Sequence, residues 1–378
     1  MQLVFNISQK ILNLFSFKIV EQKIYWAILF VAVFLFGYAT HGLFLRFSRG
    51  LGVRQPSALG QERWSAEVKP SVGGLTFFLC FSVSISLLPI EGLNVPSELK
   101  RTSFTAACCL GFLLGLADDT YDTVPVVKFI GQVLCGLILC LGGVVIEFSG
   151  VEIIDYTLTI FWVIAIMNSI NMLDNMDAIT TSVSISVLII AIIMALLIVL
   201  PSLWVYPCII GVLASLIAFL PFNWTPAKIY MGDTGSQFLG VFLAGLGVEL
   251  FWNHRVAYGG VFQVQQFMIP VLVFAVPIMD TITVFLRRLL KKSSPFVGGR
   301  DHLAHHLVYC GFSEQQVALI LFLLSIVFGI LSLSFFSEQY PFNLSLLGWS
   351  FVLLNVFLVV FFVLQILYNR GAEKKSTS

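Results

Sequence analysis

Charged residues are scarce in this chain. Only 21 Lys and Arg and 20 Asp and Glu occur among its 378 residues, or 11%, whereas a soluble domain carries roughly a quarter charged residues. The net charge of +1 gives no support for nucleic-acid binding, which requires a basic surface. Hydrophobic residues make up 58%, and 36 residues are Phe. This composition excludes an ordinary soluble domain and predicts a polytopic membrane protein.

Cysteine motifs are also missing. No CxxC spacing occurs among the seven cysteines, and all but Cys310 fall within apolar stretches. The pattern indicates neither a zinc site nor a disulfide framework, so we interpret the cysteines as small packing residues. The segment Met1 to Gln22 lacks a small-residue cleavage site. It is predicted to be an interfacial amphipathic helix and not a signal peptide.

Apolar stretches long enough for membrane-spanning helices follow one another along the chain. We predict an all-α, polytopic membrane helical bundle of about eleven transmembrane helices. Their bounds are 24–45, 72–90, 102–117, 128–147, 158–171, 180–200, 204–222, 235–252, 266–287, 316–336 and 344–368. The predicted organisation is an interfacial helix (1–22), a single transmembrane domain (23–369) and a cytoplasmic tail (370–378). No internal repeat is visible.

The Lys and Arg residues are unevenly distributed among the connections. The odd-numbered connections, counted after each span, hold most of them, and the longest are Arg46–Ser71 and Arg288–Gln315. The even-numbered ones hold only Lys100, Arg101 and Arg255. By the positive-inside rule the N-terminus lies outside and the C-terminus in the cytoplasm. Every unusual polar cluster then falls on the cytoplasmic face, which favours an active site on that side.

The polar stretch from Asn168 to Asp177 ends one apolar run shortly before another begins. Asn168, Asn171, Asp174 and Asp177 are spaced three apart, so on a continuous helix they share one polar face. Ionisable groups at membrane depth are costly, which makes them functional candidates. The alternative is an ordinary helix end followed by a polar loop.

A second cluster, Asp118 and Asp119, follows the third predicted span, and Lys128 begins the next one. Paired carboxylates at a helix end can hold a hard cation, or one of them can act as a base. Lys128 beside them is suited to a phosphate. The alternatives are a solvated acidic loop and a lysine that anchors the helix at the membrane surface.

The sharpest motif is PAKIYMGDTGS, which begins at Pro226. Asp233 lies between glycines that allow close approach of a ligand, and Gly235-Ser236 is predicted to open a helix. The N-terminal amides of a helix suit an anion, and Mg²⁺ binds one or two carboxylates together with substrate phosphates. A tight turn with a capping aspartate is the alternative.

The last cluster places His302, His305 and His306 on one helical face. Zinc is one reading, but the other candidate ligands are Asp and Asn, which favour harder cations. With Arg300 beside them, a loop that grips a nucleotide or phosphate fits better. Lys69, before the Gly73-Gly74 pair, would bind the same anion or anchor the membrane surface. Asp280, inside the ninth span, is expected to pair with a polar neighbour.

Together these clusters predict phosphoryl transfer from a soluble donor to a lipid, because such a reaction requires charge neutralisation and alignment above all. At this point the sequence resembles the polyprenyl-phosphate N-acetylhexosamine-1-phosphate transferase family. The similarity runs from Lys69 to about Phe312. It is carried by KPSVGG, Asp118-Asp119, NSINMLDNMDA from Asn168, PAKIYMGDTGS and the HLAHH segment from His302.

The resemblance implies an enzyme that transfers a sugar-1-phosphate from a UDP-sugar to undecaprenyl phosphate and releases UMP. Asp233 would be the principal Mg²⁺ ligand and Asn171 a second one, with Mn²⁺ as an alternative metal. Asp118 and Asp119 would act near the lipid phosphate, which Lys128 would hold. Lys69, Asp174, Asp177 and Asn223 would line the nucleotide side, with Asp174 also among the catalytic residues. Arg300, His302, His305 and His306 would close over the sugar and pyrophosphate.

Two departures from the family pattern bear on the donor. The family usually has DGxDG where this chain has Asp174-Asn175-Met176-Asp177-Ala178, and HxHH where this chain has HLAHH. Asn tolerates the φ > 0 of a tight turn at 175, but Ala178 does so less readily. The chain also lacks the HHHFE pattern of the phospho-MurNAc-pentapeptide transferases. UDP-N-acetylglucosamine is therefore the expected donor. The protein is expected in the inner membrane, where the reaction would start a cell-surface glycan such as lipopolysaccharide or teichoic acid.

Several alternatives remain at this stage. The donor could be another UDP-N-acetylhexosamine or UDP-MurNAc-pentapeptide, and the protein could be a homodimer. A membrane phosphatase or a CDP-alcohol-type transferase requires a different acidic array. A secondary transporter predicts inverted repeats and polar groups near mid-membrane, whereas the clusters here lie on one face. A family member that only binds lipid is the remaining reading.

Overall fold

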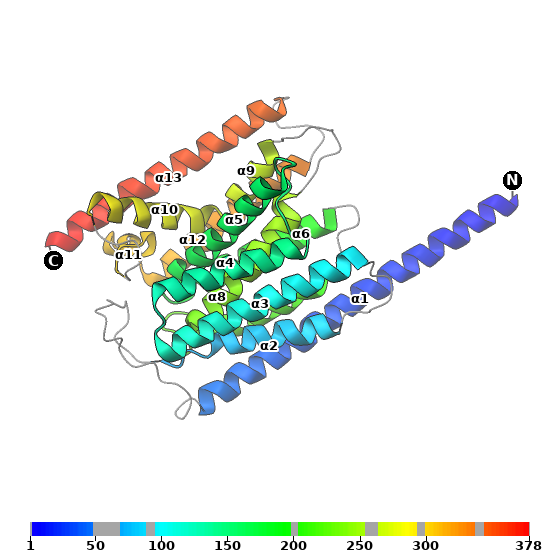
Figure 1. The fold of residues 1–378 in the computed structure, drawn as a ribbon, viewed down its shortest axis with the longest axis horizontal. Helices are drawn as coiled ribbons and strands as arrows, with labels where there is room; N and C mark the ends of the chain where they lie inside the picture. Colours follow the sequence, from blue (N-terminus) through cyan, green and yellow to red (C-terminus); the bar gives the residue numbers. More distant parts are fainter. Residues whose placement is uncertain are drawn as a thin grey trace.

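The structure is a computed structural model that describes residues 2–47, 69–87, 95–197, 203–253, 264–292, 299–336 and 344–377; the side chains of 2–23, 95–96 and 375–377 are left undescribed. All regular elements in these ranges are helices, which confirms the predicted all-helical fold (Figure 1). They are α1 (Gln2–Phe47), α2 (Gly73–Ser86), α3 (Val95–Tyr121), α4 (Pro125–Leu141), α5 (Glu152–Leu173), α6 (Ile179–Leu197), α7 (Val205–Asn223), α8 (Gly232–Leu246), η2 (Gly247–Trp252), α9 (Val264–Val273), α10 (Ala275–Leu290), α11 (Leu303–Tyr309), α12 (Glu314–Leu333), η3 (Ser334–Phe336) and α13 (Leu346–Thr377). Most of the predicted connections 46–71 and 253–265, including Arg255, and all of 337–343 lie outside the described residues.

Within the described ranges, eight helices are long and apolar enough to cross a membrane, or nine if the bent pair α9–α10 counts as one span. The apolar helices α2 and α4 are shorter. Each of the predicted spans falls on one of these helices or on the bent pair. The chain is therefore a multi-pass membrane protein. The count of eleven stays a prediction, because it requires α2 and α4 to cross as well.

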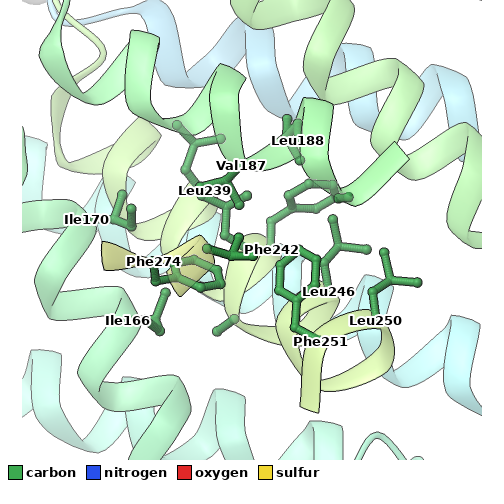
Figure 2. Packing of buried hydrophobic residues seen from close by; sticks show 14 of the residues in the cluster. Ile166, Ile170, Val187, Leu188, Leu239, Phe242, Leu246, Leu250, Phe251 and Phe274 are labelled. Carbon is green, nitrogen blue, oxygen red and sulfur yellow. The ribbon is translucent and has the colours of Figure 1, made fainter. Parts of the chain in front are cut away.

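Helix α8, continued by the π-helix η2, is the central element of the bundle. In the span Gly232–Trp252, 94% of the residues of the most apolar stretch are buried inside the protein. Figure 2 shows side chains of α5, α6, α8 and η2 meeting around Phe242, Phe251 and Phe274. A helix that is apolar on all sides is expected at the centre of a bundle. The first turn of α8 is consequently held by neighbours on several sides.

The α9–α10 pair is bent by 82°. Pro277 explains the bend, because a proline ring clashes with the carbonyl group four residues earlier, here that of Val273, the last residue of α9. Proline is tolerated in the first turn of a helix, and Pro277 lies in the first turn of α10. The bend directs α10 towards α11 and the end of α13.

Candidate active site

Glycines let three helices meet at the first turn of α8. A methyl group built on Gly115 of α3 would lie 2.2 Å from the backbone oxygen of Asp233. One built on Gly74 of α2 would lie 2.2 Å from the backbone nitrogen of Gly235. Both distances are far below van der Waals contact, so only glycine permits this packing. Backbone contact therefore fixes the position of Asp233 relative to α2 and α3.

Asp119, at the end of α3, caps the N-terminus of α8. Its Oδ1 accepts a hydrogen bond from the Asp233 amide at 3.1 Å, and its Oδ2 accepts bonds from the Thr234 amide and hydroxyl at 2.8 and 2.7 Å. The helix begins at Gly232, which has a φ of 71°, and not at Gly235 as predicted. The turn starts earlier because Asp119 satisfies amides that a helix start leaves unpaired. These amides therefore bind a carboxylate of the protein and are not open to a substrate anion.

Asp233 faces two side chains from other helices, and a third joins the group through Asp118. The amide nitrogen of Asn171 on α5 donates to Asp233 Oδ1 and to Ser236 Oγ, both at 2.8 Å. The carboxyl group of Asp118 faces that of Asp233. Lys128 at the start of α4 pairs with Asp118 Oδ2. The structure thus brings together five of the predicted residues, which we call the carboxylate half of the site: Asp118, Asp119, Lys128, Asn171 and Asp233.

Burial separates the roles of Asp118 and Lys128. The Asp118 side chain is 1% exposed, whereas that of Lys128 is 28% exposed. Asp118 Oδ1 also accepts bonds from the Thr123 amide at 3.0 Å and the Thr123 hydroxyl at 2.6 Å. Asp118 is therefore fixed beneath Lys128, and the ammonium group of Lys128 is the part that an incoming anion can reach.

The donor set here suits a hard cation. Two carboxyl groups face each other, and like charges in contact are unfavourable unless a cation or a proton lies between them. Mg²⁺ usually binds to one or two carboxylates and completes its shell with water and substrate phosphates. In the described part of the chain, no group of three or more His, Cys, Asp or Glu side chains is arranged as a metal cage. Asp118 and Asp233 are the residues of this half that could hold such a cation.

The turn after α5 differs from the prediction. The helix ends at Leu173, and its C-cap Asp174 has φ −77° and ψ 50°, so Asp174 and Asp177 do not continue the face of Asn168 and Asn171. The chain leaves the helix because it must turn into α6, where Ala178 has a φ of 65°. The positive φ that the family pattern assigns to glycine thus falls on an alanine.

Asp177 and Asn223 tie this turn to the segment before α8. Asp177 Oδ2 accepts a bond from the Ala227 amide at 2.7 Å. Asn223 Oδ1 accepts bonds from the Ala178 amide at 3.2 Å and the Thr181 hydroxyl at 2.7 Å, while its amide nitrogen donates to the Ile229 carbonyl at 3.1 Å. With Asn223 only 4% exposed, these contacts shape the backbone around the site. Asp174 is half-buried at the end of α5.

Lys69 lies where the chain enters α2. The Tyr230 amide donates to the Pro70 carbonyl at 2.9 Å, and the Gly73 amide donates to the Tyr230 carbonyl at 3.0 Å. The Lys69 ammonium group is 5.5 Å from the centre of the Tyr230 ring, within the range of a cation–π contact. This pairing attaches the predicted anion-binding segment to the chain just before Asp233.

The histidine helix α11 is capped by a carboxylate within the bundle. Asp280 of α10 is 2% exposed. Its Oδ2 lies 2.8 Å from His302 Nδ1, and its Oδ1 accepts a hydrogen bond from the Leu303 amide at 2.8 Å. The expected polar partner of Asp280 is therefore His302. A carboxylate on one ring nitrogen fixes the orientation of the imidazole, so Asp280 holds His302 in place from below. Asp280, Arg288, Asp301, His302 and His305 form what we call the histidine half of the site.

Arg288 and Asp301 form a bidentate pair at the start of α11, with Nε–Oδ2 at 2.7 Å and Nη2–Oδ1 at 2.6 Å. Burial alone would raise the pKa of Asp301, but the Arg288 guanidinium outweighs it and holds that pKa below its usual value. The carboxylate is thus ionised at neutral pH. Arg300, the neighbouring predicted residue, is half-buried.

His305 connects the histidine half to the central turn. Its ring is 1% exposed and lies against the backbone of Asn175, and its centroid is 5.6 Å from that of His302. Burial, reinforced by the neighbouring His302 and His306, lowers the pKa of His305 to about 3. His305 is therefore a neutral imidazole at neutral pH.

His306 points to a different neighbour, the last part of α13. Its ring stacks on Tyr368 with 3.5 Å between centroids, and its Nδ1 lies 3.1 Å from the Tyr368 carbonyl oxygen. The Arg287 guanidinium lies 3.8 Å from the centre of the Tyr368 ring, and the Tyr368 hydroxyl donates to the Asp301 carbonyl at 3.1 Å. The His306 ring thus has a different partner, Tyr368, from those of His302 and His305.

Sequence reasoning identified the residue types at the helix ends but missed much of what supports them. The Asp280–His302 pair, the Arg288–Asp301 pair and the contacts of Tyr368 were not predicted, because they join segments distant in sequence. One signal was available for Asp280, since a carboxylate inside an apolar span is expected to have a polar partner. No comparable signal marks Tyr368.

Comparison with known proteins gives a consistent result. Residues 101–251 match the sequence model of glycosyl transferase family 4. A relative from Bacillus subtilis (strain 168), named probable undecaprenyl-phosphate N-acetylglucosaminyl 1-phosphate transferase, is 28% identical over 70% of this chain and 72% of its own length. A decaprenyl-phosphate N-acetylglucosaminephosphotransferase from Mycobacterium leprae (strain TN) is 29% identical over 71% and 74%. A phospho-N-acetylmuramoyl-pentapeptide-transferase from Staphylococcus saprophyticus is 28% identical over 70% and 84%.

Proposed function

We propose that the chain, whose residues 101–251 match glycosyl transferase family 4, is a member of that family and transfers N-acetylglucosamine-1-phosphate from UDP-N-acetylglucosamine to undecaprenyl phosphate. The products are UMP and a lipid-linked pyrophosphoryl sugar that starts a cell-surface glycan. The relatives named for N-acetylglucosamine transfer support this donor. UDP-MurNAc-pentapeptide is the second candidate, since a relative named for that type of transfer also matches.

One observation carries the proposal. Three helix ends, those of α3, α4 and α8, bring two carboxyl groups and one ammonium group together, and Lys128 is more exposed than Asp118. Phosphoryl transfer requires groups that align and neutralise phosphates more than it requires covalent chemistry. A buried carboxylate pair next to an accessible lysine at the end of a membrane bundle supplies such groups.

Mg²⁺, or Mn²⁺ in its place, would be held by Asp233 with Asp118 beside it, and when bound it neutralises phosphate charge and stabilises the leaving UMP. In the present arrangement the side-chain N–H of Asn171 donates a hydrogen bond to Asp233 and so orients that carboxylate. As a metal ligand, its role in the original prediction, Asn171 would turn its Oδ1 towards the ion. Asp119 contributes by fixing the backbone of Asp233.

In the proposed reaction, Lys128 binds the phosphate of the lipid, and Asp118 accepts a proton if that phosphate arrives singly protonated. An oxygen of the lipid phosphate then attacks the sugar-bearing phosphorus of the donor. A new P–O bond forms while the bond to UMP breaks, and UMP leaves with the electron pair. Arg300 neutralises charge on the pyrophosphate, His302 contacts it, and His305 contacts the sugar as an uncharged group.

Lys69 and Asp174 are proposed for the uridine side. Asp177 and Asn223 serve that side indirectly, because their described bonds go to the backbone of neighbouring segments. His306 supports α11 through Tyr368. These roles keep every predicted site residue near the reaction but divide them between contact with substrate and support of the backbone.

The proposed orientation has the N-terminus outside the inner membrane and the C-terminus in the cytoplasm. The site residues, or basic residues next to them, lie at six helix ends: the ends of α3, α5, α7 and α10 and the starts of α4 and α8. Alternating crossings place all these ends on one side if α2 and α4 also cross, which gives eleven spans. The positive-inside pattern assigns that side to the cytoplasm.

The test is to incubate the purified protein with undecaprenyl phosphate, Mg²⁺ and a panel of UDP-sugars that includes UDP-N-acetylglucosamine and UDP-MurNAc-pentapeptide, and to measure UMP. Release of UMP with UDP-N-acetylglucosamine supports the proposal. Release with UDP-MurNAc-pentapeptide alone would replace the donor, and no UMP from any donor would rule out the transferase.

The Asp233→Asn variant is expected to lose turnover at saturating Mg²⁺. Asp122→Asn is the matched control, because Asp122 is an exposed carboxylate at the end of the same helix as Asp118. Its φ of 50° is also tolerated by asparagine. Turnover by Asp233→Asn at the level of Asp122→Asn would remove Asp233 from the metal role.

A further inference from the structure

A second polar layer lies directly beneath the carboxylate half. It consists of three amide side chains from three helices: Gln132 of α4, Asn168 of α5 and Gln237 of α8. Gln132 and Asn168 exchange hydrogen bonds, with Asn168 Nδ2 to Gln132 Oε1 at 2.8 Å and Gln132 Nε2 to Asn168 Oδ1 at 3.4 Å. Gln132 Nε2 also lies 3.3 Å from Gln237 Oε1. We call these residues the amide triad.

Each member of the triad lies one helical turn from a site residue on the same helix. Gln132 is four residues after Lys128, and Gln237 is four residues after Asp233. Asn168 is three residues before Asn171. Residues at these spacings share one face of a helix, and one turn is about 5.4 Å. The triad therefore repeats the Lys128–Asn171–Asp233 arrangement one turn deeper in the bundle.

Two members of the triad are buried, and the third, Asn168, is half-buried. Gln132 is 2% and Gln237 is 1% exposed. Leucine or methionine would fill such a layer as well, but apolar side chains permit small rotations and shifts of one helix against another. Buried amides must pair, and a paired amide fixes both the depth and the rotation of the helices that carry it. A single buried Asn sets helix register in coiled coils for the same reason.

We propose that Gln132, Asn168 and Gln237 are positioning residues that set the register of α4, α5 and α8, so that Lys128, Asn171 and Asp233 meet. The proposal rests on the proposed function for its catalytic consequence. In this view the triad contributes nothing to substrate binding by direct contact. It keeps the distances between the groups above it, on which alignment of the two phosphates depends.

The main test replaces all three amides by apolar residues of similar size, Gln132→Met, Asn168→Leu and Gln237→Met together. Removing a whole buried polar network is often neutral for stability, so the thermal midpoint should stay within a few degrees of that of the wild type. The turnover number should fall about tenfold or more, with KM for both substrates little changed. Wild-type turnover in this variant would overturn the proposal.

A double-mutant cycle keeps the test valid if the triple variant does not fold. Gln132→Asn shortens one side chain by a methylene group and Asn168→Gln lengthens its partner by the same amount, so the two changes together can restore the pair. Each single variant should lose turnover, and the double variant should recover most of it. If the loss of turnover in the double variant equalled the product of the losses in the two single variants, the pairing would be contradicted.

A control and a second readout separate this proposal from the proposed function. Gln266→Met removes another buried amide, one that is 6% exposed and bonded to the Glu147 carbonyl beyond the far end of α4, and should leave turnover unchanged. The labelling rate of Lys128 by an amine-reactive reagent, followed by mass spectrometry, does not depend on the reaction catalysed. It should rise several-fold in the triple variant relative to both the wild type and Gln266→Met. An unchanged labelling rate would reject the positioning role even if no donor were turned over.

Discussion

The carboxylate half and the histidine half of the site are held by different kinds of contact. In the carboxylate half, long buried helices touch through glycine backbones, as at Gly115 against Asp233. In the histidine half, a helix of only seven residues, α11, meets a glycine backbone at one place, Gly371 of α13. It is otherwise held by side chains that reach it from α10 and α13, such as Asp280 and Tyr368. Backbone contacts leave little room for change, whereas side-chain contacts can be replaced one at a time.

This difference suggests a division of labour. In the proposed reaction every donor presents the same pyrophosphate and the lipid phosphate is also constant, so the role proposed for the carboxylate half is in a step that does not vary. The sugar is the part that differs between donors. A short helix held by replaceable side chains is suited to adapt to it, and we infer that donor choice is set in the histidine half.

The largest expected effect comes from adding a methyl group to the carboxylate half. In Gly115→Ala the new Cβ would meet the Asp233 carbonyl oxygen, and α3 could relieve the clash only by moving away from α8. Turnover is expected to fall by at least about 100-fold, because a misplacement of about 1 Å costs that much. The control is Gly42→Ala on α1, where a methyl group meets nothing within 4 Å. Equal UMP release by the two variants would show that the close backbone contact at Gly115 does not distinguish the carboxylate half from the histidine half.

A smaller loss is expected in the histidine half. Asp280→Asn keeps an acceptor for the Leu303 amide but removes the charge that orients His302. Loss of such a supporting carboxylate typically costs about 10- to 100-fold in activity. The loss should appear in the turnover number and differ between donor sugars if the histidine half sets donor choice. The same fractional loss with every donor would contradict that inference.

The buried imidazole of His305 should make the protein sensitive to acid. Its pKa of about 3 in the folded protein lies below the value of about 6.5 in an unfolded chain. The stabilising effect of the neutral ring is therefore complete above pH 6.5 and is lost progressively as the pH falls towards 3. Between pH 7.5 and pH 5 the loss is about 2 kcal/mol. The thermal midpoint of His305→Gln should fall less over this range than that of the wild type, and parallel curves would disprove this account.

The smallest effect concerns the central turn. Ala178 has a φ of 65°, which costs an alanine about 1–2 kcal/mol, whereas glycine in its place loses about 0.4–1 kcal/mol through the greater freedom of the unfolded chain. Ala178→Gly should therefore stabilise the protein by about 0.5 kcal/mol, measured as a small rise in thermal midpoint. The same change at Ala191, within helix α6, should instead destabilise it by about 1 kcal/mol. A lower midpoint for Ala178→Gly would show that the turn is not strained.

The two halves also differ in how far the sequence predicts them. Apolar periodicity and helix-end motifs located α3, α4, α5 and α8, and the convergence of Asp118, Asp119, Lys128, Asn171 and Asp233 followed from placing those ends on one side. The start of α8 was wrong by three residues. A pattern within one segment does not show that Asp119, distant in sequence, caps that helix.

Apart from the expectation that Asp280 has a polar partner, the supports of the histidine half could not be predicted in this way. Tyr368 lies in an apolar helix where nothing distinguishes it from a tyrosine at the membrane surface, and only the fold brings it against His306 and Asp301. Likewise, Gln132 and Gln237 are single amides in apolar runs. Their meaning appears once three helices are packed at a known register, which depends on contacts far apart in the chain.

The contact between α11 and α13 has a consequence for how the protein is made. Gly371 packs so closely on α11 that a methyl group there would lie 2.3 Å from the His306 carbonyl oxygen, and Tyr368 bonds to Asp301. During synthesis the histidine segment leaves the ribosome well before these two residues do. The nascent chain therefore cannot complete the support of α11 until α13 has been made. Copies that stop before Tyr368 carry all the residues of both halves but lack that support.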